Sequence, residues 1–253
     1  PLIHTSRESL QQFLKQKNLK WVSDPSNSNE NFERIAQRKT WEILKVKGFS
    51  ENRIQLSADH MRRAHDALNQ MLPIHFKQIG QQELTDLLWE YKSFVSLPEE
   101  FKLRLISAVI MWNANLHYRP RFTAVLDILK NIKARKTAVL GGAIFYYHAG
   151  KIRITTELQS IKDKTVNCTP GLVWRNTWEV KRDIKDAYIA AIGIDGNKQL
   201  SKLQRSVMPH RSRIIQPGIF LKGKLLVAPT LDSGGSEYLS FCGIKFNDFL
   251  ENH

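Results

Sequence analysis

The chain has 253 residues, and its 38 lysines and arginines against 24 aspartates and glutamates give a formal net charge of +14. Hydrophobic residues make up 42% of the chain and charged residues 25%, which excludes a wholly disordered protein. A charge this basic favours a polyanionic partner, and nucleic acid is the leading candidate. The competing partner is an anionic membrane surface, but no apolar run approaches about 18 residues and no basic amphipathic helix is sustained. We expect no membrane association.

Cysteine and histidine usage argues against a disulfide framework and a metal site. Cys168 and Cys242 are too few for such a framework and form no zinc-binding set with histidine. The eight histidines are scattered, and His60 and His65 are badly spaced for ligands on one helix face. With no signal peptide in view, we expect a reducing, cytoplasmic location. Because the chain begins at Pro1, we also expect it to be the C-terminal portion of a larger protein.

The first 137 residues read mainly as helices. Thr5 and Glu8 form a capping-box pattern that predicts a helix near 6–17. Apolar residues recur at helical spacing in the stretches 57–79, 82–94, 98–117 and 120–135. In the 57–79 helix, Pro73 should cause a break or kink, and we interpret the apolar stripe bearing Met61 and Met71 as core. The residues 51–137 are therefore predicted to form a helical bundle with short links.

Strand patterns follow residue 137. Two hairpins are predicted, at 143–157 about Ala149-Gly150 and at 218–228 about Lys222-Gly223. The stretch 172–180 is a strand candidate in which Trp174 and Trp178 either pack in the core or stack on bases. Between the hairpins we expect an apolar strand at 188–194 ending in a turn, a short basic helix at 197–206 and a basic loop at 208–213. A last strand is expected within 237–246. The fold class is α+β.

The stretch from Trp21 to Arg38 is a turn followed by a helix. Pro25 biases Asp24 away from the helical region, and Ser26 or Asn27 can then cap a helix that should run from about Asn27 to Lys47, with Gly48 as its stop. Arg34 and Arg38 are four residues apart, so they should share one helix face as a paired cationic surface suited to phosphate. The alternative is a well-capped helix with two solvated arginines.

These residues, in this order, resemble the tRNA(Ile)-lysidine synthetases. The matches near the start are Pro1, Leu2, Ile3, Arg7, Trp21, Asp24, Pro25, Ser26, Asn27, Phe32, Arg34 and Arg38. Later matches are Leu140-Gly141-Gly142 with the strand pair ending at Glu157, then Pro209-His210-Arg211, Arg213, Gln216-Pro217 and residues 222–229. The resemblance extends over nearly the whole chain, although Ile35 stands where many family members have asparagine.

The resemblance implies an ATP-dependent ligase. The family adenylates the wobble cytidine, C34, of a tRNA(Ile) with a CAU anticodon, and L-lysine then displaces AMP to form lysidine. ATP, with Mg2+, is implied to bind mainly to an N-terminal PP-loop domain through a Ser-Gly-Gly-x-Asp-Ser loop. This chain has no such loop, because Ser233-Gly234-Gly235-Ser236-Glu237 lacks the aspartate and lies outside any βα unit. The family includes dimers.

The resemblance also divides the chain into three parts. Residues 1–50 are expected to be the C-terminal edge of the PP-loop catalytic domain, 51–137 a helical tRNA-binding domain, and 138–253 a mixed α+β domain. No catalytic residue is assigned. Arg34 and Arg38 are expected to bind ATP or tRNA phosphate, beside a structural motif of Trp21, Asp24, Pro25, Ser26 and Asn27. The expected tRNA-binding residues are Arg119, Arg121, Lys136, His210, Arg211 and Arg213.

Two other functions fit the same sequence. The chain alone is expected to lack ligase activity, and the alternative to the ligase is a stand-alone, non-catalytic basic RNA-binding module. A structural or protein-interaction domain would carry the same charge for solubility and for compensation of helix dipoles. Salt-dependent tRNA binding separates the two RNA-binding functions from the third, because phosphate contacts weaken as salt rises.

Overall fold

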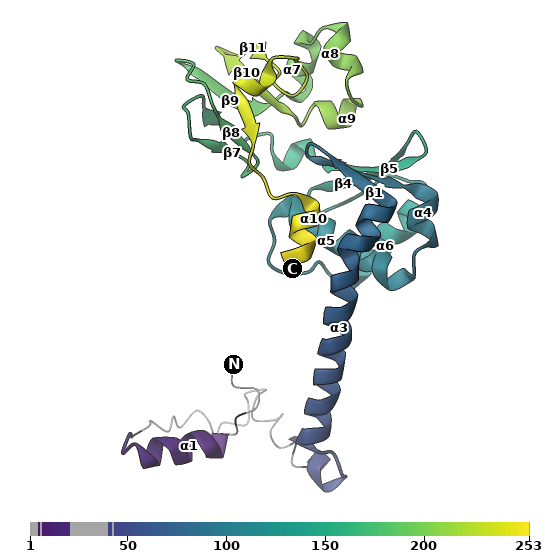
Figure 1. The fold of residues 1–253 in the computed structure, drawn as a ribbon, viewed down its shortest axis with the longest axis vertical. Coiled ribbons are helices and arrows are strands. Elements are labelled where there is room, and N and C mark those ends of the chain that lie inside the picture. Colours follow the sequence, from purple (N-terminus) through teal and green to yellow (C-terminus); the bar gives the residue numbers. More distant parts are fainter. Residues whose placement is uncertain (1–4, 6, 21–39, 42, 253) are drawn as a thin grey trace. The chain divides into compact units, whose positions relative to one another are not determined.

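A computed structural model of the chain describes residues 5, 7–20, 40–41 and 43–252 (Figure 1). The chain divides into two compact units, residues 1–63 and 64–253. The stretch from Trp21 to Arg38 lies outside the described residues, so its turn and its paired arginines stay predictions.

The first unit contains two of the expected helical stretches. Helix α1 covers Arg7–Gln16 and confirms the helix predicted near 6–17. A second helical stretch includes residues 40–41 and 43–46 and ends, as predicted, at Gly48, whose φ of +89° suits glycine. The Trp41 indole donates a hydrogen bond to Glu51 Oε1 at 2.8 Å, and Lys45 Nζ lies 3.1 Å from the same oxygen. These two partners lower the pKa of Glu51.

Helix α3 runs from Glu51 to Ile79 and continues past Pro73, so of the break or kink predicted there the break does not occur. The buried residues of α3 are Leu72, Pro73, Phe76 and Ile79, and their packing compensates for the hydrogen bond that proline cannot make. The predicted core stripe is wrong for Met61 and Met71, which are 74% and 41% exposed. Helical spacing shows which residues share a face, but only the neighbouring elements decide how much of that face is covered.

An antiparallel sheet forms the centre of the second unit. It has five strands in the order β1-β2-β5-β4-β3. Their bounds are β1 Gly80–Glu83, β2 Asp86–Glu90, β3 Ala138–Leu140, β4 Ala143–His148 and β5 Lys151–Thr156. The β4–β5 hairpin confirms the prediction for 143–157, and its turn has positive φ at Ala149 and Gly150.

The helix predicted at 82–94 is wrong. This stretch forms most of the β1–β2 hairpin and the start of a short helix, α4 Tyr91–Ser96. Leu87 pairs with Ile154 of β5, and Trp89 is completely buried. The leucine-rich sequence suits a helix locally, but strand β5, more than 60 residues later, supplies a partner that favours the extended form. The residues 51–137 are therefore not all helical.

Three helices cover one face of this sheet: α5 Glu99–Ala114, α6 Phe122–Lys133 and α10 Phe246–Asn252 (Figure 1). Helices α5 and α6 confirm the helices predicted after Pro98 and Pro120. Their buried residues form one core with Trp89, Phe145 and Phe246. Helix α10 was not predicted. We call residues 64–156 together with α10 the sheet lobe.

Residues 158–245 form a C-terminal lobe with its own core. One sheet has the order β11-β10-β9-β6 and the other β12-β8-β7. The strands are β6 Val166–Asn167, β7 Val173–Trp174, β8 Trp178–Val180, β9 Ala187–Ala191, β10 Pro217–Leu221, β11 Lys224–Val227 and β12 Leu239–Phe241. The short helices are η2 Leu158–Ser160, α7 Gly193–Gln199, α8 Lys202–Ser206, α9 His210–Arg213 and η3 Gly235–Glu237. The mixture of helices and antiparallel sheets confirms the α+β class.

The C-terminal lobe corrects several local predictions. The strand predicted at 172–180 is a hairpin, and Arg175 and Asn176 take positive φ at its turn. Trp174 and Trp178 are 0% and 5% exposed, so they are core residues and do not stack on bases. The predicted loop at 208–213 contains α9. The predicted helix at 197–206 is divided between α7 and α8, because Ser201 caps a new helix in a capping box with Gln204.

Candidate functional site

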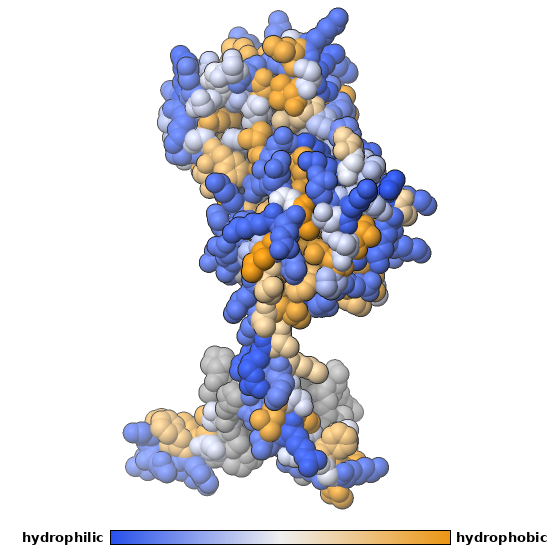
Figure 2. Space-filling model, turned by 45° about the vertical axis from the view of Figure 1, so that its right-hand side comes forward, coloured by the Kyte–Doolittle hydropathy of each residue, from blue (hydrophilic) through white to orange (hydrophobic). Residues whose placement is uncertain are grey.

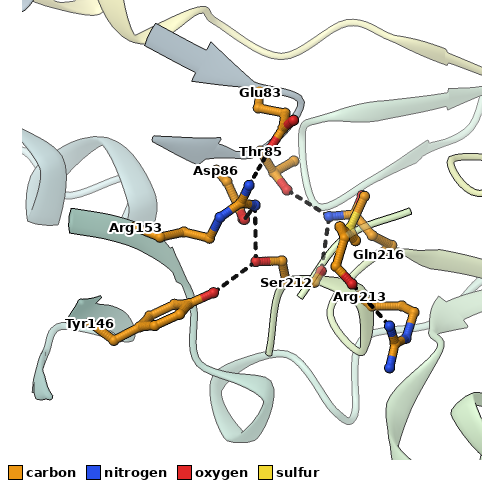
Figure 3. A network of polar contacts seen from close by, with 9 residues as sticks. Glu83, Thr85, Asp86, Tyr146, Arg153, Ser212, Arg213 and Gln216 are labelled. Atoms are coloured by element: carbon orange, nitrogen blue, oxygen red, sulfur yellow. Dashed lines mark hydrogen bonds and ion pairs between the residues drawn. The ribbon is translucent and has the colours of Figure 1, made fainter. Parts of the chain in front are cut away.

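A buried ionic network joins the sheet to helix α9 (Figure 3). Arg153 points from β5 toward the C-terminal lobe, whereas its neighbours Ile152 and Ile154 belong to the sheet-lobe core. Its guanidinium Nη1 lies 2.7 Å from Asp86 Oδ2, and its Nη2 pairs with Glu83. Asp86 is 1% exposed and Arg153 7%, so this pair is shielded from solvent.

Helix α9 is attached to this network through Ser212. Arg153 Nη1 donates to Ser212 Oγ at 3.2 Å, and the Tyr146 hydroxyl lies 3.1 Å from the same oxygen. Gln216 Nε2 donates to the Ser212 carbonyl at 3.1 Å and to Thr85 Oγ1 at 3.3 Å. These contacts connect the two lobes and hold α9 against the face of the sheet that α5 and α6 leave uncovered (Figure 1).

Burial sets the electrostatics of the network. Desolvation raises the pKa of Asp86, against the opposing effects of Ser212, Thr155 and Arg153. Burial also acts to lower the pKa of Arg153, but Asp86 and Glu83 outweigh it and hold the pKa of this guanidinium above its ordinary value. Arg153 therefore stays charged beneath α9, and its charge is already neutralised by carboxylates.

The outer side of α9 presents a different arginine. Arg211 is exposed, and its guanidinium lies 5.3 Å from the centre of the Tyr146 ring. Its Nη1 donates to Thr137 Oγ1 at 3.2 Å. This contact brings α9 beside the segment that follows α6, although the two are more than 70 residues apart in the chain. Lys136, next to Thr137, is thereby placed near Arg211.

Arg135 extends the same basic surface. It has a φ of +56°, and its guanidinium lies 4.8 Å from the ring centre of Tyr91 and 5.0 Å from that of Tyr147. The Tyr91 hydroxyl donates to the Lys133 carbonyl at 2.8 Å, which fixes the end of α6. We call Arg135, Lys136, His210 and Arg211 the α9 patch. Within the described part of the chain, none of these four side chains forms an ion pair.

A second basic cluster lies between α3 and α5. Arg104 donates to Glu100 Oε1 and to Asn69 Oδ1, both at 2.7 Å, and its Nη1 is 3.1 Å from His65 Nδ1. Arg119 Nη2 is 3.4 Å from His65 Nε2. Burial, then Arg119 and Arg104, lower the pKa of His65, so the imidazole is held neutral between two arginines. A neutral imidazole has one acceptor nitrogen and accepts from one of them at a time.

The structure separates the six expected tRNA-binding residues into four groups. Lys136, His210 and Arg211 come together in the α9 patch. Arg119 belongs to the second cluster, and Arg121 is exposed at the N-terminus of α6. The local sequence pattern marks Arg135 as one of several cations at a helix end but does not single out Tyr146, because nothing in it shows that α9 packs beside them.

Arg213 is the exception, because it is 7% exposed. Its Nε donates to Asn197 Oδ1 at 2.7 Å, and its Nη1 donates to the carbonyls of Met208, at 2.9 Å, and Arg205. The expectation that Arg213 faces RNA is corrected: it lies on the inner side of α9 and fastens the surrounding backbone. Arg34, Arg38 and the motif Trp21 and Asp24 to Asn27 lie outside the described residues.

The described residues do not fit an ATP phosphate loop. The Ser233–Glu237 stretch contains η3, and a Cβ built on Gly235 would lie 1.6 Å from the Pro229 carbonyl oxygen. This glycine is required by close backbone packing rather than by a ligand. Across the described ranges, no three His, Cys, Asp or Glu side chains gather as a metal ion would require.

The surface in view is mixed rather than continuously apolar. Hydrophobic residues on the visible face of residues 64–253 occur in small groups bordered by hydrophilic ones (Figure 2). Within the parts of the chain that the structure describes, no helix is both long and apolar enough to span a membrane.

Comparisons with known proteins point to one family. The profile of the PP-loop domain matches residues 1–44. A tRNA(Ile)-lysidine synthase from Ruegeria pomeroyi is 27% identical over 230 residues, which is 90% of this chain and 54% of that protein. The synthase from Orientia tsutsugamushi is 32% identical over 192 residues, 71% of this chain and 43% of that protein. The synthase from Wolbachia pipientis is 30% identical over 171 residues, 66% and 40% of the two chains. The chain thus spans about half the length of these relatives.

Proposed function

We propose that this chain, a relative of the tRNA(Ile)-lysidine synthases, forms part of an ATP-dependent ligase that joins L-lysine to the wobble cytidine of tRNA(Ile). In this proposal the chain positions the tRNA, and the adenylation chemistry belongs to a PP-loop domain of which residues 1–44 are the matched part. That match favours the ligase over a stand-alone RNA-binding module. ATP, with Mg2+, would be held mainly by the rest of that domain, and the enzyme would act in the cytoplasm, as a homodimer if it follows the dimeric members of the family.

The α9 patch is the observation that carries the positioning role. Arg135 and Lys136 come from the segment that follows α6, and His210 and Arg211 come from α9. The buried network holds α9 on the sheet, and the hydrogen bond from Arg211 to Thr137 joins α9 to the segment that follows α6. Cations that are fixed in place and have no carboxylate partner favour a phosphate backbone, because they need not break an ion pair to bind it.

Two further features fit a phosphate contact. Arg135 and Arg211 lie over tyrosine rings, which restrict their guanidinium groups and reduce the entropy lost on binding. The net charge of +14 supplies a long-range attraction for tRNA over and above these contacts. The patch would read position and shape rather than base sequence, since phosphate contacts carry no sequence information directly.

The division of labour along the chain stays a proposal. Residues 1–50 would complete the catalytic domain, where Arg34 and Arg38 would face ATP or tRNA phosphate. Residues 51–137 and 138–253 would each contribute to tRNA binding, with Arg119 and Arg121 in the first and the α9 residues in the second. The five-stranded sheet contains strands from both sides of residue 137, so these two parts share one core.

The test is tRNA binding by the chain as a function of salt. Wild type and a Lys136→Ala/Arg211→Ala variant would be titrated with a tRNA(Ile) transcript by filter binding at several salt concentrations. Loss of the two cations should weaken binding roughly tenfold or more at low salt. The slope of log affinity against log salt should fall by about one for each phosphate contact removed.

The matched control is Arg182→Ala/Lys185→Ala, which also removes two positive charges from exposed positions of the C-terminal lobe. It should leave affinity and salt slope close to wild type. If wild type bound tRNA with no dependence on salt, or if the control lost as much affinity as the patch variant, the α9 patch would not be the tRNA contact.

A further inference from the structure

A cavity of about 580 Å³ lies in the second unit, where the sheet lobe meets the C-terminal lobe. Its walls come from the end of α5, the turn between β3 and β4, the end of β5 and the β7–β8 turn. The lining residues that bear on its chemistry are Trp112, Asn113, Thr156, Lys164, Arg175 and Phe241. The α9 patch uses none of them.

Arg175 is the unusual residue of this cavity. It sits at the β7–β8 turn with a φ of +57°, a conformation that an arginine rarely adopts. Its Nη2 donates to Thr156 Oγ1 at 3.0 Å, and Thr156 Oγ1 in turn donates to Asn113 Oδ1 at 2.7 Å. Its Nη1 is buried and has no hydrogen-bond partner in the described part of the chain.

No carboxylate compensates this guanidinium. None of the residues that line the cavity is acidic, and the other cation among them is Lys164. Burial alone lowers the pKa of Arg175 to about 10, so at neutral pH the side chain is still charged. The Thr156 hydroxyl and the Trp174 ring, whose centre lies 5.4 Å from the guanidinium, carry no net negative charge. A buried charge without a counter-ion is costly, and an oxyanion in the cavity would supply the missing acceptor for Nη1.

The backbone turn between β3 and β4, which lines the cavity, is closely packed. Gly141 and Gly142 both have positive φ, and a Cβ on Gly141 would lie 2.7 Å from Ile110 Cγ2. On Gly142 it would lie 3.1 Å from Ser160 Oγ. The turn therefore fits closely between α5 and η2, and Trp112 is held by a 2.8 Å hydrogen bond from its indole to the Ile244 carbonyl. The three aromatic side chains of the lining, Trp112, Phe241 and Phe249, give the cavity an apolar wall beside its cationic one.

We propose that this cavity binds one nucleotide of an RNA strand, with the phosphate on Arg175 and Lys164 and the nucleoside toward Trp112 and Phe241. The Thr156 hydroxyl, which is itself hydrogen-bonded to the Asn113 side chain, orients the Arg175 guanidinium. The volume suits a single nucleotide rather than a duplex. This inference rests on the proposed function, because it supplies a second tRNA contact apart from the α9 patch.

The test compares Arg175→Met with Arg182→Met, which removes one positive charge from an exposed position outside the cavity. Arg175→Met should weaken tRNA(Ile) binding roughly tenfold or more, since a charge-assisted contact is lost, while Arg182→Met stays near wild type. The melting temperature of Arg175→Met should not fall, because the variant removes a desolvated charge. A merely structural arginine would instead lower the melting temperature and leave affinity per folded molecule unchanged.

Titration calorimetry with inorganic phosphate and with AMP identifies the source of the phosphate. Binding of either that disappears in Arg175→Met supports the phosphate site. If those ligands bound but tRNA affinity were the same in wild type and Arg175→Met, the cavity would belong to a free nucleotide and the RNA assignment would be overturned.

Because Lys164 is exposed, Lys164→Met should not impair folding. Like Arg175→Met, it should weaken the binding of tRNA. Unchanged tRNA affinity in both cavity variants, with no phosphate binding, would overturn the inference while leaving the α9 patch untouched. Failure of wild type to bind tRNA at all would contradict the proposed function instead.

Discussion

Arg211 and Arg213 stand two residues apart in one short helix, yet they do opposite things. Arg211 is exposed over the Tyr146 ring, and Arg213 is buried among backbone carbonyls. Four residues in a helix turn through a full circle, so neighbours at this spacing face different surroundings. A basic run is therefore a poor guide to which of its members meet a ligand.

At the residue scale, His65 is expected to make the free energy of unfolding depend on pH. Its pKa is lowered in the native state, so the unfolded chain binds a proton near pH 6.5 that the native chain does not yet accept. The stability that His65 contributes is present above about pH 6.5 and is lost as pH falls through the native pKa. Urea unfolding at pH 7.5 and pH 5 should show a larger loss for wild type than for His65→Gln. Equal losses in the two proteins would mean that His65 is not held neutral.

At the scale of elements, α9 is held by polar contacts rather than by an apolar stripe. Its four residues are His-Arg-Ser-Arg. Hydrogen bonds of Ser212 to β4 and β5, and of Arg211 and Arg213 to neighbouring segments, fix its position. A helix this short has no stability of its own. The buried pair of Asp86 and Arg153 therefore matters for where Arg211 points, whatever it contributes to the free energy of folding.

A double-mutant cycle on Asp86 and Arg153 tests this. Asp86→Leu should lower the free energy of unfolding by about 3–5 kcal/mol, because it leaves a buried guanidinium with only the half-exposed Glu83. The double variant Asp86→Leu/Arg153→Met should recover much of that loss, since it removes both desolvated charges. Urea denaturation of the four proteins measures the coupling. Additive losses would show that the pair is not coupled.

At the scale of the whole molecule, the two proposed phosphate contacts and the match to the PP-loop domain lie in different parts of the chain. Residues 64–253 carry both the α9 patch and the Arg175 cavity, and residues 1–44 match the PP-loop domain. Two separated phosphate contacts would orient a folded RNA far better than one, since each restricts a different rotation.

The role of Arg34 and Arg38 has to be tested in the full-length ligase that we propose, because this chain alone is expected to lack ligase activity. Replacing both by alanine should reduce lysidine formation at least tenfold, about 1.4 kcal/mol of transition-state stabilisation, while the melting temperature stays nearly unchanged. Lysidine measured in a tRNA(Ile) transcript gives the rate. Lys15→Ala/Lys17→Ala, at two exposed positions in and just after the last turn of α1, is the control. Unaltered turnover in the arginine variant would remove both residues from the phosphate-binding role.

The sequence by itself determined the features that depend on neighbours along the chain. Glycine turns fixed the hairpins at 143–157 and 218–228, proline and apolar spacing fixed α5 and α6, and the charge balance pointed to a polyanion. Only the tertiary structure decided that 82–94 forms strands, that Arg213 is buried, and that Arg211 lies beside Lys136. The physical reason is that these outcomes depend on tertiary contacts that spacing along the chain does not show, and the packing and hydrogen bonds of these contacts override local preference.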